Sequence, residues 1–141
     1  MMERGRRIAF DYGDVRIGVA VSDPDSILAS PLTTLKAMDK SLVRQISQIF
    51  IEIDPVAIYV GRPGLLSGND GAASKKAFDF VELLRTITQV PVELVDERMS
   101  TISAARNLRD AGRNAQESKN AIDMAAAVAI LEFALELEKG K

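Results

Sequence analysis

The sequence predicts a single α/β domain over residues 1–141, built on a mixed sheet of five strands that is flanked by helices. Two apolar runs near the start are joined by a short turn, as in a β-hairpin. Two later apolar runs are each followed by a helical pattern, which is typical of buried parallel strands. The length and the 47% share of hydrophobic residues fit one domain with its own core.

The opening stretch, residues 8–23, predicts two strands covered on both faces, because its apolar runs contain almost no polar residue. We place the turn between them at Gly13-Asp14, where glycine would accept a positive φ. A connection from Pro24 to Pro31 follows. A third strand is expected at Leu32–Leu35, and it would complete an antiparallel meander before two strands add in parallel.

The rest of the chain alternates helices and strands. Asp39 is the expected N-cap of a helix that runs to about Glu52, before Pro55. The elements after it are predicted as a strand at 56–60, a glycine-rich loop at 61–71, a helix at 72–87, a strand at 91–96, a helix from Ser100 to about Ala111 and a helix from Asn120 to about Glu138. The apolar stripes of three helices are Leu42, Ile46, Ile49 and Ile53; Ala77, Phe80, Val81 and Leu84; and Ile122, Ala126, Ala129, Ile130, Phe133 and Leu137.

Composition restricts the chemistry. The chain has no cysteine and no histidine, which excludes disulfides, thiolate nucleophiles, zinc–thiolate sites, iron–sulfur clusters and an imidazole base. Any reaction must therefore use carboxylates, lysine, arginine, hydroxyls and the backbone. All-oxygen ligation favours Mg²⁺ or Mn²⁺ over zinc.

Charge and hydropathy bear on partners and location. The net charge is −2, yet arginines cluster before the first strand and again in residues 98–113. A locally basic face suits a nucleic-acid substrate, and scattered solvated arginines explain the same pattern equally well. The N-terminus lacks a signal-peptide pattern, and no apolar window is long enough to span a bilayer. We expect a cytoplasmic protein without a membrane partner.

Asp11 and Glu97 are candidate site residues at strand ends. Asp11 stands where the first strand should still be buried, and a buried carboxylate is costly unless it is paired, protonated or metal-bound. The alternative is a last strand residue that bonds to turn backbone. Glu97 alternates with Glu93 and Val95, so it can project from the carboxyl end of its strand. The alternative for Glu97 is an ordinary surface turn.

Asp123 is the one charged residue between Ala121 and Leu131. The alanines around it allow a close approach of the helix to the sheet, which would bring this carboxylate near the sheet surface. The alternative is an acid that favours the first helical turn, with Asn120 as the cap. Three carboxylates without histidine or cysteine suit one or two magnesium ions that activate water for phosphodiester cleavage. That arrangement is typical of ribonuclease H-like folds.

The glycine-rich loop follows a buried strand and precedes a helix, a position where α/β proteins bind ligands. It contains neither a Gly-Lys-Ser/Thr loop nor a GxGxxG pattern. Its amides could hold a phosphate near the helix N-terminus, while a plain flexible loop is the simpler interpretation.

Four segments in order resemble the YqgF family, which is ribonuclease H-like and described both as Holliday-junction resolvases and as nucleases that mature the small-subunit ribosomal RNA precursor. The resemblance covers essentially the whole chain. The segments are Asp11-Tyr12-Gly13-x-x-Arg16-Ile17-Gly18-Val19-Ala20, Gly61-x-Pro63 with Gly68 and Gly71, Val95-Asp96-Glu97-Arg98-Met99-Ser100-Thr101, and Ile122-Asp123-x-Ala125-Ala126-Ala127. The loop departs from the family at Arg62-Pro63-Gly64, where an apolar residue usually separates glycine from proline.

The resemblance implies a metal-dependent nuclease. The family's acidic triad falls on Asp11, Glu97 and Asp123, which would hold Mg²⁺ or Mn²⁺ with Asp11 as the central ligand. Candidate substrate contacts are Arg16, Arg98 and Lys119, together with Gly61 and Gly68 of the loop.

The expected substrate is RNA rather than branched DNA. Junction resolution calls for two symmetry-related active sites, and nothing in the sequence indicates a dimer face. A monomer or weak dimer acting on precursor ribosomal particles is therefore favoured, with Holliday-junction resolution as the alternative. A non-catalytic module that binds nucleic acid or ribosomes is the rival from another class, and a nucleotide-binding phosphotransferase is a more distant one.

Overall fold

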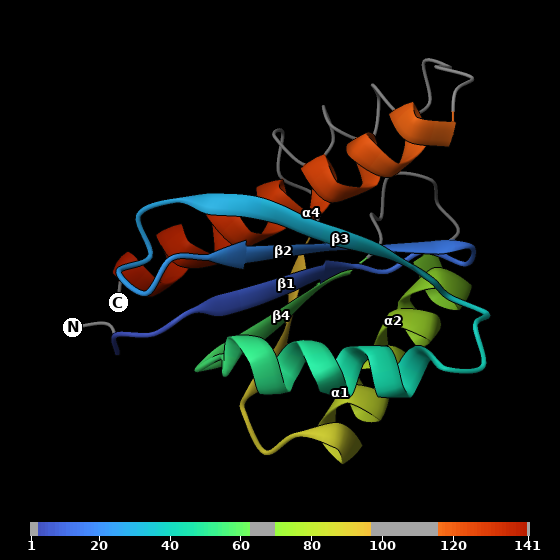
Figure 1. Ribbon diagram of the computed structural model, residues 1–141, viewed down its shortest axis with the longest axis horizontal. Coiled ribbons are helices and arrows are strands. Elements are labelled where there is room, and N and C mark those ends of the chain that lie inside the picture. Colours follow the sequence, from blue (N-terminus) through green and yellow to red (C-terminus); the bar gives the residue numbers. More distant parts are fainter. Residues whose placement is uncertain (1–2, 63–69, 97–115, 141) are drawn as a thin grey trace.

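The computed structural model describes residues 3–62, 70–96 and 116–140 (Figure 1). Five strands form one sheet in the order β3-β2-β1-β4-β5. The elements are β1 (Arg7–Asp11), β2 (Arg16–Ser22), β3 (Ala29–Lys36), α1 (Leu42–Ile53), β4 (Ala57–Arg62), α2 (Asp70–Ile87), β5 (Val92–Asp96) and α4 (Gln116–Lys139).

The pairing of the strands confirms the predicted mixed sheet. β1 pairs antiparallel with β2, and β2 with β3. β4 pairs parallel with both β1 and β5. The strands β1, β4 and β5 therefore end at the same side of the sheet, which we call the carboxyl edge. In α/β proteins this edge is where ligands bind.

Two core layers cover the two faces of the sheet. Helices α1 and α2 lie on one face and α4 crosses the other (Figure 1). Successive residues of β1 pack into opposite layers. Ile8 and Phe10 pack toward α1 and α2, and Ala9 packs toward α4. Half of the buried residues in the α4 layer are alanines. Because alanine adds so little width, the helix backbone can lie close to the sheet, as the sequence predicts.

The connection between β1 and β2 differs from the predicted two-residue turn. It comprises four residues, Tyr12–Val15, since β1 ends at Asp11 and β2 begins at Arg16. Gly13 does not have a positive φ; among the described glycines Gly5 does. Gly13 is needed for another reason, because a Cβ there would lie 2.7 Å from the carbonyl oxygen of Arg16.

Strand β3 is longer than predicted and includes Pro31, which the sequence placed in a connection. The register shifts here, with Val19 opposite Thr33 and Ala20 opposite Pro31, so Leu32 is the extra residue of a bulge. Proline is tolerated because β3 is an edge strand whose outer side needs no ladder donor.

The structure corrects the predictions for the helices in three respects. Asp39 is not the N-cap of α1; Ser41 holds that position, and the Asp39 carboxylate accepts hydrogen bonds from the Ser41 amide and hydroxyl. α4 begins at Gln116 instead of Asn120, because the polar residues before Asn120 are compatible with helix. The predicted α4 stripe is buried at Ala126, Ala129 and Ile130, whereas Leu137 is half exposed. The buried face also includes residues outside the predicted stripe, namely Asp123, Ala127, Leu131, Ala134 and Leu135.

The remaining helical predictions divide into two groups. The α2 stripe of Ala77, Phe80, Val81 and Leu84 is buried as predicted. The helix expected over residues 100–111 lies outside the described residues. Within the described ranges, no helix is both long and apolar enough to cross a membrane.

Candidate functional site

Asp11 is the last residue of β1 and lies at the carboxyl edge. Side chains alternate between the two faces of a strand, and Asp11 is two residues beyond Ala9. Asp11 therefore belongs to the same face as Ala9, the one covered by α4. Only 2% of the residue is exposed. The β1–β2 register sets Asp11 opposite Gly18.

At Gly18 the backbone of α4 lies directly against the sheet. A Cβ on Gly18 would lie 2.2 Å from the carbonyl oxygen of Asp123 and 3.2 Å from the amide nitrogen of Met124. The backbone of α4 thus occupies the space that a side chain would need, and Asp123 is held beside the strand that pairs with Asp11. The sequence analysis quoted Gly18 only within a motif. The missed signal was a glycine inside an apolar strand, which often marks close approach by another backbone.

Asp123 is itself buried, with 3% of its surface exposed. The row that it shares with Ala127 and Ile130 faces the sheet, as both of these residues are fully buried. The isolated acid of the apolar helix therefore lies inside the packed face of α4, where the sequence analysis had placed it beside that face. A carboxylate in this position requires a partner to remain charged.

Arg16 supplies that partner from the first position of β2. Its Nε donates to Asp123 Oδ2 at 2.7 Å, and its side chain is 22% exposed while that of Asp123 is 4% exposed. The sequence analysis proposed Arg16 as a phosphate contact and did not foresee this ion pair. The two roles are compatible, because a guanidinium carries four further N–H donors on its terminal nitrogens.

β5 leads toward the same edge. Val92 and Leu94 pack in the α1–α2 layer and Val95 packs in the α4 layer, which confirms the alternation expected for this strand. Its register places Val95 level with Gly61 of β4, which is buried. Glu97 is the next residue with the parity of Val95, and it lies outside the described residues.

The other predicted contacts are distributed as follows. Arg98 and Gly68 lie outside the described residues. Lys119 belongs to the first turns of α4 rather than to a connection, and its side chain is not among those described. The structure thus brings together Asp11, Asp123 and Arg16 at one edge, with Gly61 in the neighbouring strand.

Tyr12 and Lys76 border this edge on the α2 side. The Tyr12 ring packs against Phe80, with ring centroids 4.9 Å apart. Lys76 donates from Nζ to Asp14 Oδ1 at 2.9 Å, and this carboxylate raises the pKa of Lys76. These two contacts hold the β1–β2 connection against α2. They therefore help to fix the end of β1 that carries Asp11.

The donor set fits a hard divalent cation. Asp11 and Asp123 offer carboxylate oxygens in a buried position, and such oxygens are the ligands that magnesium and manganese prefer. Within the described ranges no three acidic residues group closely enough to hold a metal. Any third carboxylate must come from outside those ranges, and Glu97 directly follows them.

Comparisons with known proteins match the chain over nearly its whole length. The family model RuvX, described as Holliday junction resolvase, matches residues 5–137. A protein of Streptomyces coelicolor named "Putative pre-16S rRNA nuclease" is 46% identical over 140 residues, covering 98% of this chain and 84% of the relative. A protein of Streptomyces avermitilis with the same name is also 46% identical, over 98% of this chain and 90% of the relative.

Solved structures give the same fold at low identity. Thermus thermophilus RuvC matches with a TM-score of 0.57 at 14% identity, and 96% of each chain is covered. RuvC of the same organism in complex with a Holliday junction substrate matches with a TM-score of 0.56 at 15% identity, again over 96% of each chain. The ribonuclease H-like fold predicted from the sequence is confirmed.

Proposed function

The chain belongs to the RuvX family, and from this premise we propose that it is a metal-dependent nuclease that hydrolyses phosphodiester bonds of a ribosomal RNA precursor. The observation that carries the proposal is the juxtaposition of two buried acids at the carboxyl edge. Asp11 ends the central strand, and Asp123 reaches the paired strand because Gly18 lets α4 approach. Burying a carboxylate is costly, and two buried carboxylates at one edge of the sheet are an arrangement that a bound cation would stabilise.

In this proposal Asp11, Asp123 and Glu97 hold Mg²⁺ or Mn²⁺. When bound, the cation supplies a more acidic water and neutralises charge on the departing oxygen. Asp11 serves as the central ligand because it is the acid on the central strand. Arg16 orients the Asp123 carboxylate through its hydrogen bond, and it also presents guanidinium N–H groups to a substrate phosphate. Arg98, Lys119, Gly61 and Gly68 are the further substrate contacts.

The relatives support RNA as the substrate, since proteins 46% identical to this chain are named as nucleases of pre-16S ribosomal RNA. The proposed setting is the cytoplasm, on precursor ribosomal particles, with the protein as a monomer or weak dimer. Holliday-junction cleavage is the second candidate, favoured by the description of the family model. It would require two copies of the site in one assembly.

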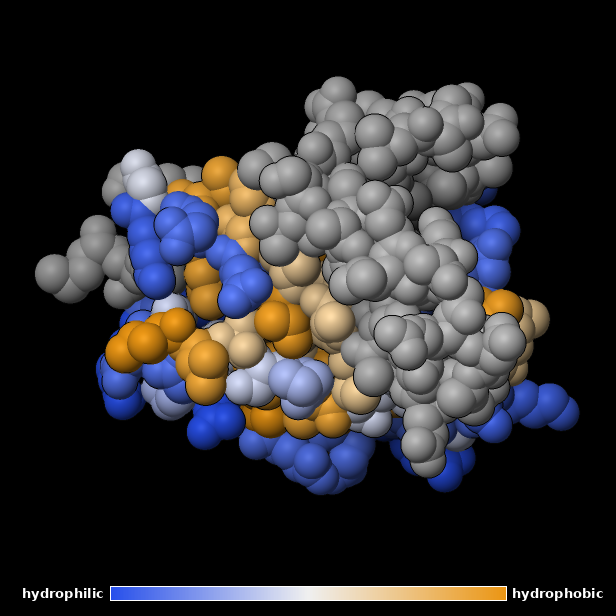
Figure 2. Space-filling model, turned by 90° about the horizontal axis from the view of Figure 1, so that it is seen from above, coloured by the Kyte–Doolittle hydropathy of each residue, from blue (hydrophilic) through white to orange (hydrophobic). Residues whose placement is uncertain are grey.

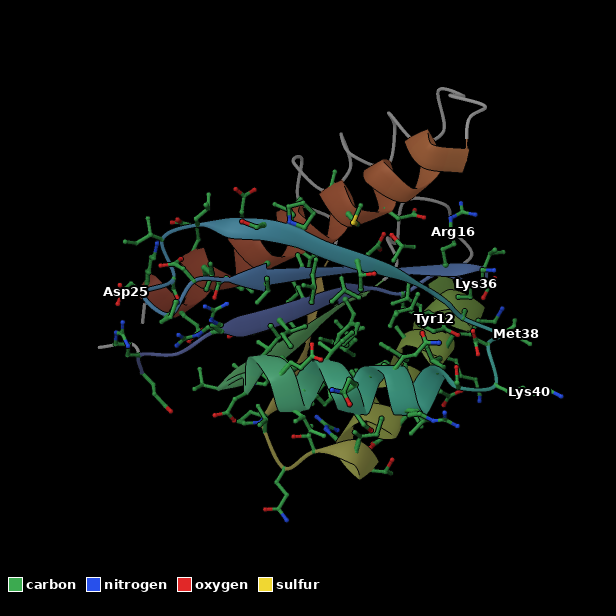
Figure 3. All side chains as sticks on the ribbon, in the orientation of Figure 1. Tyr12, Arg16, Asp25, Lys36, Met38 and Lys40 are labelled. Atoms are coloured by element: carbon green, nitrogen blue, oxygen red, sulfur yellow. The ribbon has the colours of Figure 1, made fainter. Side chains whose placement is uncertain are left out.

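The test compares wild type with Asp11→Asn on precursor RNA, single-stranded RNA, a four-way DNA junction and duplex DNA. Each reaction runs with magnesium, with manganese or with chelator. Asp25→Asn is the matched control, because that carboxylate is 57% exposed and lies at the opposite end of the sheet (Figure 3).

We expect metal-dependent cleavage that Asp11→Asn abolishes and Asp25→Asn leaves intact, with Asp11→Asn at least as stable as wild type because a carboxylate repulsion is removed. Precursor RNA as the preferred substrate supports the first candidate, and the junction supports the second. If Asp11→Asn unfolds, Asp11 is structural. If wild type cuts nothing in any metal, the binding-module alternative replaces the nuclease.

A further inference from the structure

A hollow of about 450 Å³ opens beside the candidate site, where β2 and β3 meet the connections around them. It is lined by Asp14, Val15, Arg16, Thr34, Leu35, Lys36, Met38 and Asp39. Arg16 belongs to both places, since it lines the hollow and bonds to Asp123. The hollow therefore borders the ion pair that holds Asp123 in the candidate site.

Two cations lie side by side at this hollow. The β2–β3 register pairs Arg16 with Lys36, so the two side chains leave neighbouring strands on the same face of the sheet. Like charges at directly opposed positions destabilise a sheet. Figure 3 shows both residues at the same end of the molecule, with Lys40 close by. That repulsion is offset here, because Arg16 is paired with Asp123 and Lys36 acts on Asp39. The remaining N–H donors of the two neighbouring cations can bind an anion.

The acids of the lining are already engaged. Asp14 accepts from Lys76 at 2.9 Å. Asp39 accepts from the backbone amide of Ser41 at 2.8 Å and from its hydroxyl at 2.7 Å. The Ser41 amide and, less strongly, Lys36 lower the pKa of Asp39. The lining therefore carries both signs of charge, and Arg16 and Lys36 are its N–H donors toward an anion.

The same place exposes apolar side chains. Val15 is 65% exposed and Met38 is 86% exposed, and Leu35, which packs in the α1–α2 layer, also lines the hollow. At the right-hand edge of Figure 2 a small hydrophobic area lies among hydrophilic ones, at the end of the molecule where Figure 3 labels Met38. An apolar surface next to paired cations matches the two parts of a nucleotide, a flat base and a phosphate.

We propose that this hollow is a nucleobase subsite: an unpaired base of the substrate packs against Val15, Leu35 and Met38 while the adjoining phosphate lies at Arg16 and Lys36. The inference rests on the proposed function and sharpens it. A base inside a duplex is stacked and paired and cannot enter a hollow, so the subsite selects a substrate that is single-stranded beside the cleaved bond.

The experiment measures binding of fluorescein-labelled RNA and DNA oligonucleotides to the full chain by anisotropy, in chelator so that no cleavage occurs. The oligonucleotides are an intact single strand, a set in which each base in turn is replaced by an abasic residue, and a duplex. The variants are Met38→Ala and Lys36→Gln. Their controls are Ile51→Ala, an exposed apolar residue on α1, and Lys139→Gln, at the end of α4 far from the hollow.

We expect one abasic position to weaken binding to wild type by up to about fivefold, the lower end for a base stacked on an aromatic ring, because the side chains of the hollow are not aromatic. Met38→Ala should weaken binding of the intact strand to a similar extent and should show no further loss at that abasic position. Lys36→Gln should reduce the salt slope of log affinity by about one for every strand. Ile51→Ala and Lys139→Gln should bind the intact strand as wild type does. Met38→Ala should bind the duplex as wild type does.

Several results would overturn the subsite. Additive losses from Met38→Ala and from the abasic residue would show that they act at different places. Equal weakening of the duplex would show that the hollow does not select unpaired bases. A wild-type dimer that Met38→Ala separates would assign the hollow to a second copy of the chain. Each of these leaves nucleic-acid binding intact, whereas a wild type that binds no oligonucleotide refutes the proposed function itself.

Discussion

Replacing Gly18 by alanine tests whether the approach of α4 builds the site. The new Cβ would lie 2.2 Å from the carbonyl oxygen of Asp123, and ordinary contact begins near 3.4 Å, so α4 has to retreat by about 1.2 Å. The obstacle is backbone, which cannot rotate away as a side chain can. We therefore expect a cost near the upper end of overpacking, about 3 kcal/mol, and a Tm lower by about 10 °C.

The same retreat would carry Asp123 away from Asp11. A misplacement of about 1 Å in a reacting group can cost about 100-fold in rate, so we expect Gly18→Ala to lose about that much cleavage activity. Circular dichroism gives the Tm, and cleavage of labelled precursor RNA in magnesium gives the rate. Gly140→Ala is the control, because its Cβ would meet its nearest neighbour at an ordinary 3.5 Å.

Two outcomes would refute this reasoning at different steps. A Gly18→Ala protein with wild-type Tm and wild-type rate would show that α4 does not lie against β2 at this position. A destabilised protein that cuts at the wild-type rate would show that α4 lies there but that Asp123 has no part in the reaction.

Three further predictions concern charge. Arg16→Gln should lower the free energy of unfolding by about 3 kcal/mol in chelator, because it removes the guanidinium that is ion-paired with the buried Asp123 carboxylate, and divalent metal should restore part of that loss. Arg4→Gln, which breaks an exposed pair, should change neither the stability nor its response to metal, and denaturant unfolding measures both. Glu138→Leu should lower the free energy of unfolding by several kcal/mol, because it leaves the buried Arg7 guanidinium without its carboxylate. Adding Arg7→Met to this variant should recover stability in the same denaturant unfolding measurement. Backbone amides, foremost that of Leu28, lower the pKa of Asp23 from its usual 3.8. The stability that this carboxylate contributes is present above its unfolded pKa and is lost as the pH falls through its lower folded pKa. Asp23→Asn should therefore flatten the acid limb of an unfolding series at pH values below about 5.

The sequence predicted the central part of the fold because burial leaves a strong pattern there. β1 and β4 contain the unbroken apolar runs Ile8–Phe10 and Ala57–Val60, and the α2 stripe repeats at helical spacing. The edge strand β3 was predicted too short, because an edge needs no apolar pattern and tolerates Pro31. The first turns of α4 were missed because polar helical residues that carry no stripe look like a connection.

The candidate site was partly predictable for a similar reason. Asp11 and Asp123 could be found because each is a lone acid in an apolar run, and such an exception needs a cause. The partner of Asp123 could not be found, since Arg16 is 107 residues away and local spacing carries no information about that contact. Lys36 was missed too, because its significance lies in the β2–β3 register that sets it opposite Arg16.

The position of Asp123 depends on both ends of α4. Near one end, Gly18 and Arg16 hold the helix against β2. At the other end, Glu138 accepts from Arg7 at 3.1 and 3.2 Å and from the Tyr59 hydroxyl. The two anchors are 15 residues apart, or about 22 Å of helix, so a slide of α4 along the sheet has to break both.

Arg7 and Asp11 are the first and last residues of β1. One strand therefore carries the Arg7–Glu138 ion pair at one end and the central acid at the other. Breaking the Arg7–Glu138 ion pair leaves the Arg16 bond and the Gly18 contact to hold Asp123. These two contacts lie within a single turn of α4. A helix fixed at one end can pivot, and its far end moves most. The Glu138→Leu change should therefore lower stability far more than cleavage activity, whereas Gly18→Ala should lower both.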